Sequence, residues 1–145
     1  MQDAVDQFYA WIIRDKATYI TLYLPHRQSK HSALFEHILQ RLSMVIRNLR
    51  ARGIRFFFLG MDANETLPPG IDTCTGVACR PRTNDRKEHR DRRDLLVAFL
   101  LENSFMVITT YSCTKIGSEL VTWQGPRGAA EQIDVLAVSE PEPNE

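Results

Sequence analysis

Long apolar runs are absent from the sequence, because no stretch approaches the ~18 consecutive apolar residues that a membrane-spanning helix needs. The N-terminal residues also lack the charged-then-apolar order of a secretory signal peptide. We therefore expect no membrane partner and an intracellular location, with the nucleus as one option.

Cysteine is scarce, with 3 residues in a chain of 145. Cys74, Cys79 and Cys113 cannot form a complete set of disulfides, and their spacing matches no zinc motif. This pattern favours reduced thiols with a structural role.

An excess of one charge is lacking as well, since 18 Lys and Arg residues balance 18 Asp and Glu residues. A neutral protein does not attract nucleic acid through its overall field, so any such binding requires a local patch. Apolar residues make up 43% and charged residues 25% of the chain, values typical of soluble globular domains rather than of disordered or fibrous chains. A chain of 145 residues has room for one domain.

The N-terminal half alternates strand and helix patterns. Residues that are β-branched or aromatic dominate Gln7–Ile13 and Thr18–Leu24, which predicts a hairpin. Apolar residues three and four positions apart in His31–Arg52 predict an amphipathic helix that ends at Gly53. The segment Ile54–Gly60 contains a continuous apolar run, which is typical of a central strand covered on both faces.

The C-terminal half continues the alternation after a long irregular segment. Glu65–Arg90 shows no clear period and is predicted to be a loop, and helical spacing returns in Arg92–Asn103. Further strands are predicted at Phe105–Thr110, Leu120–Trp123 and Ile133–Val138. The acidic, proline-containing tail, residues 140–145, is expected to be disordered. This order predicts an α/β domain with a mixed sheet in residues 1–139.

Two polar side chains, Asp62 and Asn64, directly follow the apolar strand. Ligand and catalytic groups gather at such strand ends, and residues two apart on an extended backbone point to the same side. A carboxylate and an amide could then share one phosphate or metal ion. The alternative is a turn in which both side chains bind backbone amides.

Two further segments carry polar groups of the same kind. Asp134 opens the last apolar strand, and Tyr23 and His26 flank Pro25 at the end of the second predicted strand. Each has a plainer interpretation: Asp134 as a residue that starts a strand, Tyr23 as a core residue, and His26 as a surface residue.

In combination, these segments resemble the endonuclease/exonuclease/phosphatase (DNase I-like) family. That family includes pancreatic deoxyribonuclease, abasic-site endonucleases, inositol polyphosphate 5-phosphatases and the endonucleases of LINE-type retrotransposons. Its strands end in Tyr-x-Pro-Asn or Tyr-x-Pro-His, then Gly-Asp-x-Asn, then Thr-Trp and Ile-Asp, with helices between the earlier strands. The matching segments are Tyr23-Leu24-Pro25-His26, Gly60-Met61-Asp62-Ala63-Asn64, Thr122-Trp123 and Gln132-Ile133-Asp134. The last two are most similar to the retrotransposon enzymes.

The resemblance implies a DNase I-like four-layered α/β sandwich, in which two mixed sheets pack together between helices. It also implies phosphodiester cleavage by activated water with Mg²⁺, or with Mn²⁺ in its place, and DNA as the substrate. A reverse transcriptase is a possible fused partner. The implied catalytic residues are Asp62, Asn64, Asp134 and Tyr23, with Asp134 also a metal ligand. The implied substrate-binding residues are His26, Thr122, Trp123, Arg90 and Arg93.

The sequence departs from the family at three places. Met61 stands where the family usually has glycine, and Gly60 is displaced by one position. No residue before Gln7 supplies the family's upstream asparagine and metal-binding glutamate, and no histidine follows Asp134 to complete the closing Ser-Asp-His. We therefore expect a domain incomplete at both ends with little nuclease activity. The alternatives are a phosphatase of the same fold and a non-catalytic remnant that binds nucleic acid or a partner.

One basic cluster stands out between Arg80 and Arg93, with seven Arg and Lys residues against three acids. It could lie along a nucleic-acid backbone, where each phosphate contact would add salt dependence. It could equally be a solvated loop that leads into a helix.

Overall fold

The computed structural model describes residues 7–26, 32–79, 86–111, 122–125 and 130–139. These residues form a mixed α/β fold built on a five-stranded sheet of order β1-β2-β3-β7-β4, with a separate two-stranded ribbon, β5-β6. The strands are β1 (Tyr9–Arg14), β2 (Ala17–Tyr23), β3 (Phe56–Asp62), β4 (Met106–Val107), β5 (Trp123–Gln124), β6 (Ala130–Glu131) and β7 (Asp134–Ser139). The helices are α1 (Ser32–Ala51), α2 (Lys87–Glu102) and the 3₁₀ turn η1 (Ile108–Thr110).

The β1–β2 hairpin is confirmed. Its two-residue turn, Asp15 and Lys16, has φ values of 51° and 68°. Positive φ at both turn residues is the geometry whose twist matches that of two antiparallel strands. β2 then pairs with β3 in parallel, and β3 pairs with β7 in the antiparallel direction.

The helix α1 agrees with its predicted span to within one residue at each end. Its apolar stripe is buried in the core through Phe35, Ile38, Leu42, Ile46 and Leu49. Gly53 ends the helix with φ +87°, and the next amide, of Ile54, donates to the carbonyl of Leu49 at 3.1 Å. This is the expected left-handed C-terminal cap.

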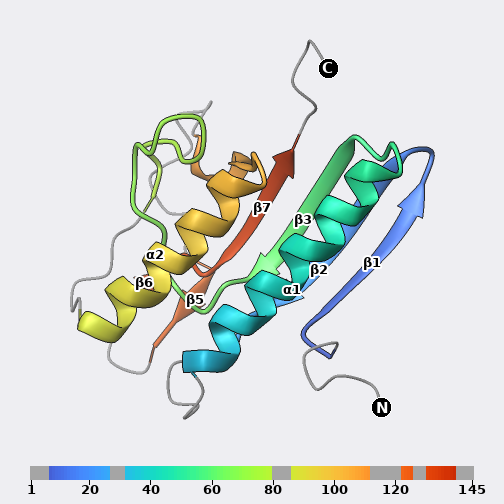
Figure 1. The fold of residues 1–145 in the computed structure, drawn as a ribbon. Helices are drawn as coiled ribbons and strands as arrows, with labels where there is room; N and C mark the ends of the chain where they lie inside the picture. The colour runs from blue at the N-terminus through green and yellow to red at the C-terminus, as the bar shows by residue number, and fades with distance from the viewer. Residues whose placement is uncertain (1–6, 27–31, 80–85, 112–121, 126–129, 140–145) are drawn as a thin grey trace.

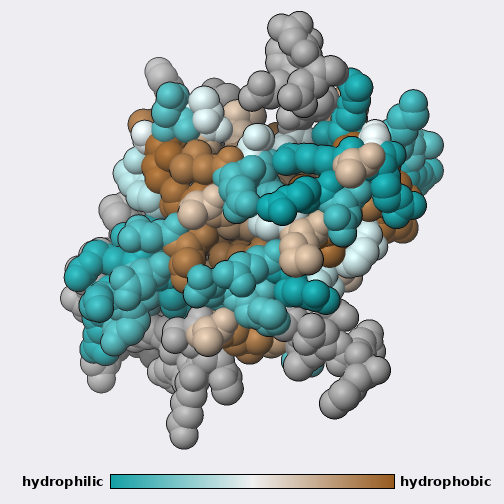
Figure 2. All heavy atoms as spheres, in the orientation of Figure 1, coloured by the Kyte–Doolittle hydropathy of each residue, from teal (hydrophilic) through white to brown (hydrophobic). Residues whose placement is uncertain are grey.

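Both helices lie across the same face of the sheet (Figure 1). Figure 2 views that face, where hydrophilic side chains cover much of the surface and apolar surface shows mainly at the upper and centre left. Among the described residues, no helix is long and apolar enough to cross a membrane.

The prediction that β3 is covered on both faces is wrong. Phe57, Leu59 and Met61 are buried under the helices, whereas Phe56 and Phe58 are 43% and 40% exposed. The strand is central, as expected, but both helices cover one face, and no described element covers the other. The continuous apolar run therefore conceals an alternating burial pattern.

The C-terminal boundaries differ from prediction in two places. α2 begins at Lys87, so the predicted loop Glu65–Arg90 is shorter than expected. The predicted strand Phe105–Thr110 forms only the two-residue β4 before η1. β7 confirms the predicted strand Ile133–Val138 to within one residue.

Some predictions fall partly or wholly outside the described residues. The disordered tail lies outside them, as do residues 120 and 121 of one predicted strand, and Cys113. Cys74 is free and fully buried, and Cys79 is free and half-buried. Burial raises the pKa of the Cys79 thiol to about 11, which agrees with an unreactive, structural thiol.

Candidate functional site

Three polar residues that are distant in the sequence form one row across the sheet. The strand register pairs Tyr23 of β2 with Asp62 of β3, and Asp62 with Asp134 of β7. Paired residues on adjacent strands point to the same face, with Cβ atoms about 5 Å apart. We call Tyr23, Asp62 and Asp134 the polar row. It lies on the open face of the sheet, the face without helices, at the edge where β2 and β3 end.

Tyr23 is 49% exposed, which excludes the interpretation that it is a core residue. Its ring stacks on that of Phe8, with the ring centroids 6.3 Å apart. Asp134 is exposed and Asp62 is half-buried. The row therefore presents a phenol and two carboxylates to solvent.

Asp62 is held by the turn that follows β3. Its Oδ1 accepts a hydrogen bond of 3.1 Å from the backbone amide of Asn64. Burial raises the pKa of the Asp62 carboxyl, and the negative charge of Asp134 raises it further, while the Asn64 amide and His26 act in the opposite direction. Asp134 and His26 are thus close enough to Asp62 to influence its charge.

Asn64 does not have the extended backbone on which the expected same-side arrangement depended. Its φ is +47°, in the left-handed region that asparagine tolerates better than most residues. Its side-chain amide donates to the carbonyl of Leu24 at 2.7 Å, across the gap between the ends of β2 and β3. The turn interpretation holds for Asp62, whose side chain binds a backbone amide, whereas the side chain of Asn64 binds a backbone carbonyl and ties the two strand ends together.

His26 is exposed and follows the last contact between β2 and β3, in which the amide of Leu24 donates to the carbonyl of Asp62 at 2.9 Å. This contact continues the pairing one residue past Tyr23. It places the Pro25–His26 segment beside the polar row.

Thr122 and Trp123 lie next to the start of β7. The hydroxyl oxygen of Thr122 accepts hydrogen bonds from the backbone amides of Ile133 and Asp134, both at 3.0 Å. The backbone of Trp123 pairs with Glu131 in the β5–β6 ribbon. The Thr122 oxygen thus fixes the backbone at Asp134, a role that the sequence did not reveal.

The basic cluster is divided by the helix into inward and outward residues. Arg86, Lys87 and Arg90 are exposed, whereas His89 and Arg92 are buried and residues 80–85 lie outside the described ranges. Arg93 is half-buried, and its Nε donates to the carbonyl of Thr66 at 3.2 Å. Within the described part of this segment, the inward residues contact the protein itself, and nucleic-acid binding by the exposed residues stays a prediction.

A buried cluster of charged residues lies directly behind the site loop, and the sequence did not reveal it. Glu65 follows Asn64 and has no exposed surface, and its Oε2 lies 2.8 Å from Nδ1 of His89. Its Oε1 lies 3.9 Å from Arg93. A guanidinium nitrogen of Arg92 donates to the carbonyl of Pro25. Residues 89, 92, 93 and 96 are three or four positions apart, so they share one helical face with the apolar residues of α2. This spacing could have indicated that polar residues extend the buried face toward the N-terminus of the helix.

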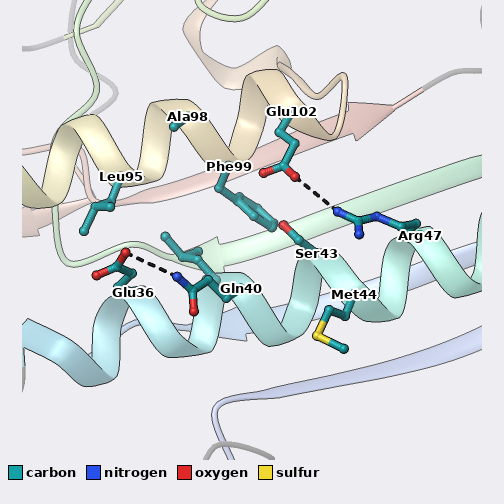
Figure 3. A pocket seen from close by; sticks show the side chains of 10 residues that line it. Glu36, Gln40, Ser43, Met44, Arg47, Leu95, Ala98, Phe99 and Glu102 are labelled. Atoms are coloured by element: carbon teal, nitrogen blue, oxygen red, sulfur yellow. Dashed lines mark hydrogen bonds and ion pairs between the residues drawn. The ribbon is translucent and has the colours of Figure 1, made fainter.

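A separate groove of about 300 Å³ lies between the two helices on the other side of the sheet (Figure 3). The exposed ion pair between Arg47 of α1 and Glu102 of α2, at 3.5 Å, crosses the groove, and a hydrogen bond from Gln40 to Glu36 runs along its α1 side. It shares no residue with the polar row. The groove and the polar row are therefore two separate features on opposite faces of the sheet.

The carboxylates of the polar row are compatible with one kind of metal site only. Within the described ranges, no group of three or more His, Cys, Asp and Glu side chains could hold a metal ion. Mg²⁺, however, is commonly bound by one or two carboxylates together with water and substrate phosphate. Asp134 and Asp62 match that arrangement, and they do not match a closed, all-protein site.

Comparison of the chain with protein-family models and with curated proteins finds no match.

Neutralising Asp62 is expected to stabilise the protein at neutral pH. The folded state raises the pKa of this carboxyl above its ordinary value of 3.8, so in the window above pH 3.8 the folded state binds more protons than the unfolded state. The free energy of unfolding therefore falls as pH rises through that window. Asp62→Asn removes this decrease, because asparagine does not ionise. Because Asp62 is partly exposed, we expect a gain below ~1 kcal/mol at pH 7 that disappears at pH 3. Thermal unfolding at both pH values measures it, and a gain independent of pH would contradict the explanation.

Proposed function

We propose that the chain is a domain of the endonuclease/exonuclease/phosphatase family that cleaves phosphodiester bonds in DNA with the help of a divalent metal ion. The observation that carries the proposal is the polar row, because the register of three strands brings together Tyr23, Asp62 and Asp134. These are residues to which the resemblance gives catalytic roles, and their meeting does not depend on it.

Each member of the row has a distinct task in this reaction. Asp62 orients the attacking water and accepts its proton, and its raised pKa makes it a better base than an ordinary aspartate. Asp134 binds the metal ion, and the Tyr23 hydroxyl donates a hydrogen bond to a phosphate oxygen. When bound, Mg²⁺ supplies compensation for the negative charge that develops on the phosphoryl oxygens. His26, beside Asp62, is placed to contact the same phosphate.

The open face of the sheet supports the proposed four-layered architecture. A second row, which we call the apolar row, crosses all five strands through paired residues: Ile12, Tyr19, Phe58, Val138 and Met106. Tyr19 and Phe58 stack with ring centroids 5.0 Å apart and are 46% and 40% exposed. A face of this kind suits a second sheet packed about 10 Å away, as in two-sheet sandwiches. The polar row would then lie at the rim of that sandwich.

A non-catalytic domain that binds nucleic acid or a partner is the second candidate. The side-chain amide of Asn64 is already bound to Leu24, and the described residues supply only two carboxylates to a metal ion. Arg86, Lys87 and Arg90 are exposed at the start of α2, where this candidate function has a phosphate backbone bind.

The two candidates differ in a plasmid-nicking assay with Mg²⁺. The proposed function predicts slow conversion of supercoiled DNA to the nicked form, in keeping with the little nuclease activity expected from the sequence. It also predicts inhibition by a chelator and a loss of about 10²- to 10⁴-fold in Asp62→Ala, because a general base is removed. Asp72 is an exposed aspartate in the loop after β3, so Asp72→Ala is the matched control and should keep the activity of the unaltered chain. DNA binding without turnover would favour the second candidate. Hydrolysis of a small phosphomonoester but not of DNA would identify a phosphatase.

A further inference from the structure

The two loops that carry the candidate site are both attached to the first turns of α2. His89 and Arg93 contact the loop after β3 through Glu65 and Thr66, at 2.8 Å from His89 to Glu65 and 3.2 Å from Arg93 to Thr66. Arg92 donates to the carbonyl of Pro25 in the loop after β2. One helical turn thus reaches both strand ends.

These contacts are polar, although apolar side chains alone could pack the first turns of α2 against the two loops. Farther along, α2 packs through Leu96, Phe99 and Leu100, which are buried. His89 and Glu65 are also fully buried, and removing such groups from water carries a large desolvation penalty. Hydrogen bonds between buried polar groups are directional, so they fix the relative position of two elements more narrowly than apolar contacts do.

A short chain of contacts leads from α2 to the polar row. Glu65 is gripped by His89 and is adjacent to Asn64 in the sequence. The side chain of Asn64 holds the end of β2 at Leu24, and its backbone amide holds the carboxylate of Asp62. A displacement of Glu65 would therefore move both groups that Asn64 binds.

We propose that the first turns of α2 are the positioning device of the site, and that Glu65 is the positioning residue that fixes Asn64 and, through it, the carboxylate of Asp62. The inference rests on the proposed function for its catalytic meaning. Its structural part, the coupling of Glu65 to Asn64, stands independently and is tested separately.

The test compares Glu65→Gln with Glu88→Gln in the full chain. Both changes neutralise a glutamate at nearly the same size, but Glu88 lies exposed in the first turn of α2. In ¹⁵N-resolved NMR spectra, Glu65→Gln should shift the backbone and side-chain amide signals of Asn64 and leave those of Leu59 and Ala137, in the centre of the sheet, unchanged. Glu88→Gln should leave all of them unchanged. General destabilisation would not produce such a local shift in the folded state.

The kinetic readout follows the same logic. With Mg²⁺ and plasmid DNA, Glu65→Gln should lower kcat by about 10- to 100-fold with little change in KM, because small misplacements of reacting groups act on the chemical step. If Glu65→Gln does not fold, Arg93→Gln removes a contact from the same loop and should shift the same Asn64 signals. Unshifted Asn64 signals in whichever of these variants folds would overturn the inference. An unaltered chain without any nicking activity would overturn the proposed function instead, while the Asn64 signals would still decide the coupling.

Discussion

The double variant Tyr19→Thr, Phe58→Thr is expected to stay monomeric at concentrations at which the unaltered chain self-associates. Both residues belong to the apolar row on the open face and are 46% and 40% exposed. Large exposed apolar patches drive association, and a sheet face is well shaped to pack on another sheet. Threonine keeps the β-branched shape that favours strands while it removes the aromatic surface.

The expected effect is large because each dimer would lose four aromatic side chains. At about 1 kcal/mol for each half-buried ring, or about 4 kcal/mol in all, the association constant should fall by about 1,000-fold. Sedimentation equilibrium over a range of concentrations measures this constant. Val77→Thr is the control, since Val77 is 82% exposed but lies in the loop after β3. If the unaltered chain is monomeric at every concentration tested, the open face does not drive self-association. That result would weaken the case for a second sheet packed on it.

Replacing His89 with alanine should destabilise the protein by about 1 to 3 kcal/mol, the range for leaving a buried polar group without its hydrogen-bond partner. The carboxylate of Glu65 has no exposed surface, and His89 is its partner at 2.8 Å. Arg93 lies farther from Glu65, at 3.9 Å. Loss of His89 therefore removes the short hydrogen bond from a fully buried carboxyl group.

A matched control separates this effect from the general effect of alanine in a helix. His37 is an exposed histidine on α1, and His37→Ala should change the free energy of unfolding by less than ~0.5 kcal/mol. Urea unfolding followed by circular dichroism gives both values. Equal stabilities of the two variants would mean that the Glu65–His89 contact contributes little to folding.

The sequence was most informative where periodicity and strand-end chemistry coincided. The hairpin, α1, β3 and β7 were all predicted close to their observed positions, because alternation and helical spacing are local properties of the chain. Asp62 and Asp134 were predicted to be site residues because Asp62 ends one apolar strand and Asp134 opens another. The prediction of α2 was right at its C-terminal end and wrong at its start, because the first turns face inward through His89 and Arg92 and no apolar period marks them.

The sequence by itself determined the order of the elements. It also determined which polar side chains, able to bind ligands or take part in catalysis, stand at the ends of the strands. Only the tertiary structure decided that the register pairs Tyr23 with Asp62 and Asp62 with Asp134, and that Asn64 turns away to bind Leu24. It also decided that Glu65 is buried against His89, and that one face of the sheet remains open. The physical reason is that these features depend on contacts between residues distant in the chain, whereas patterns of propensity and polarity report only on neighbours.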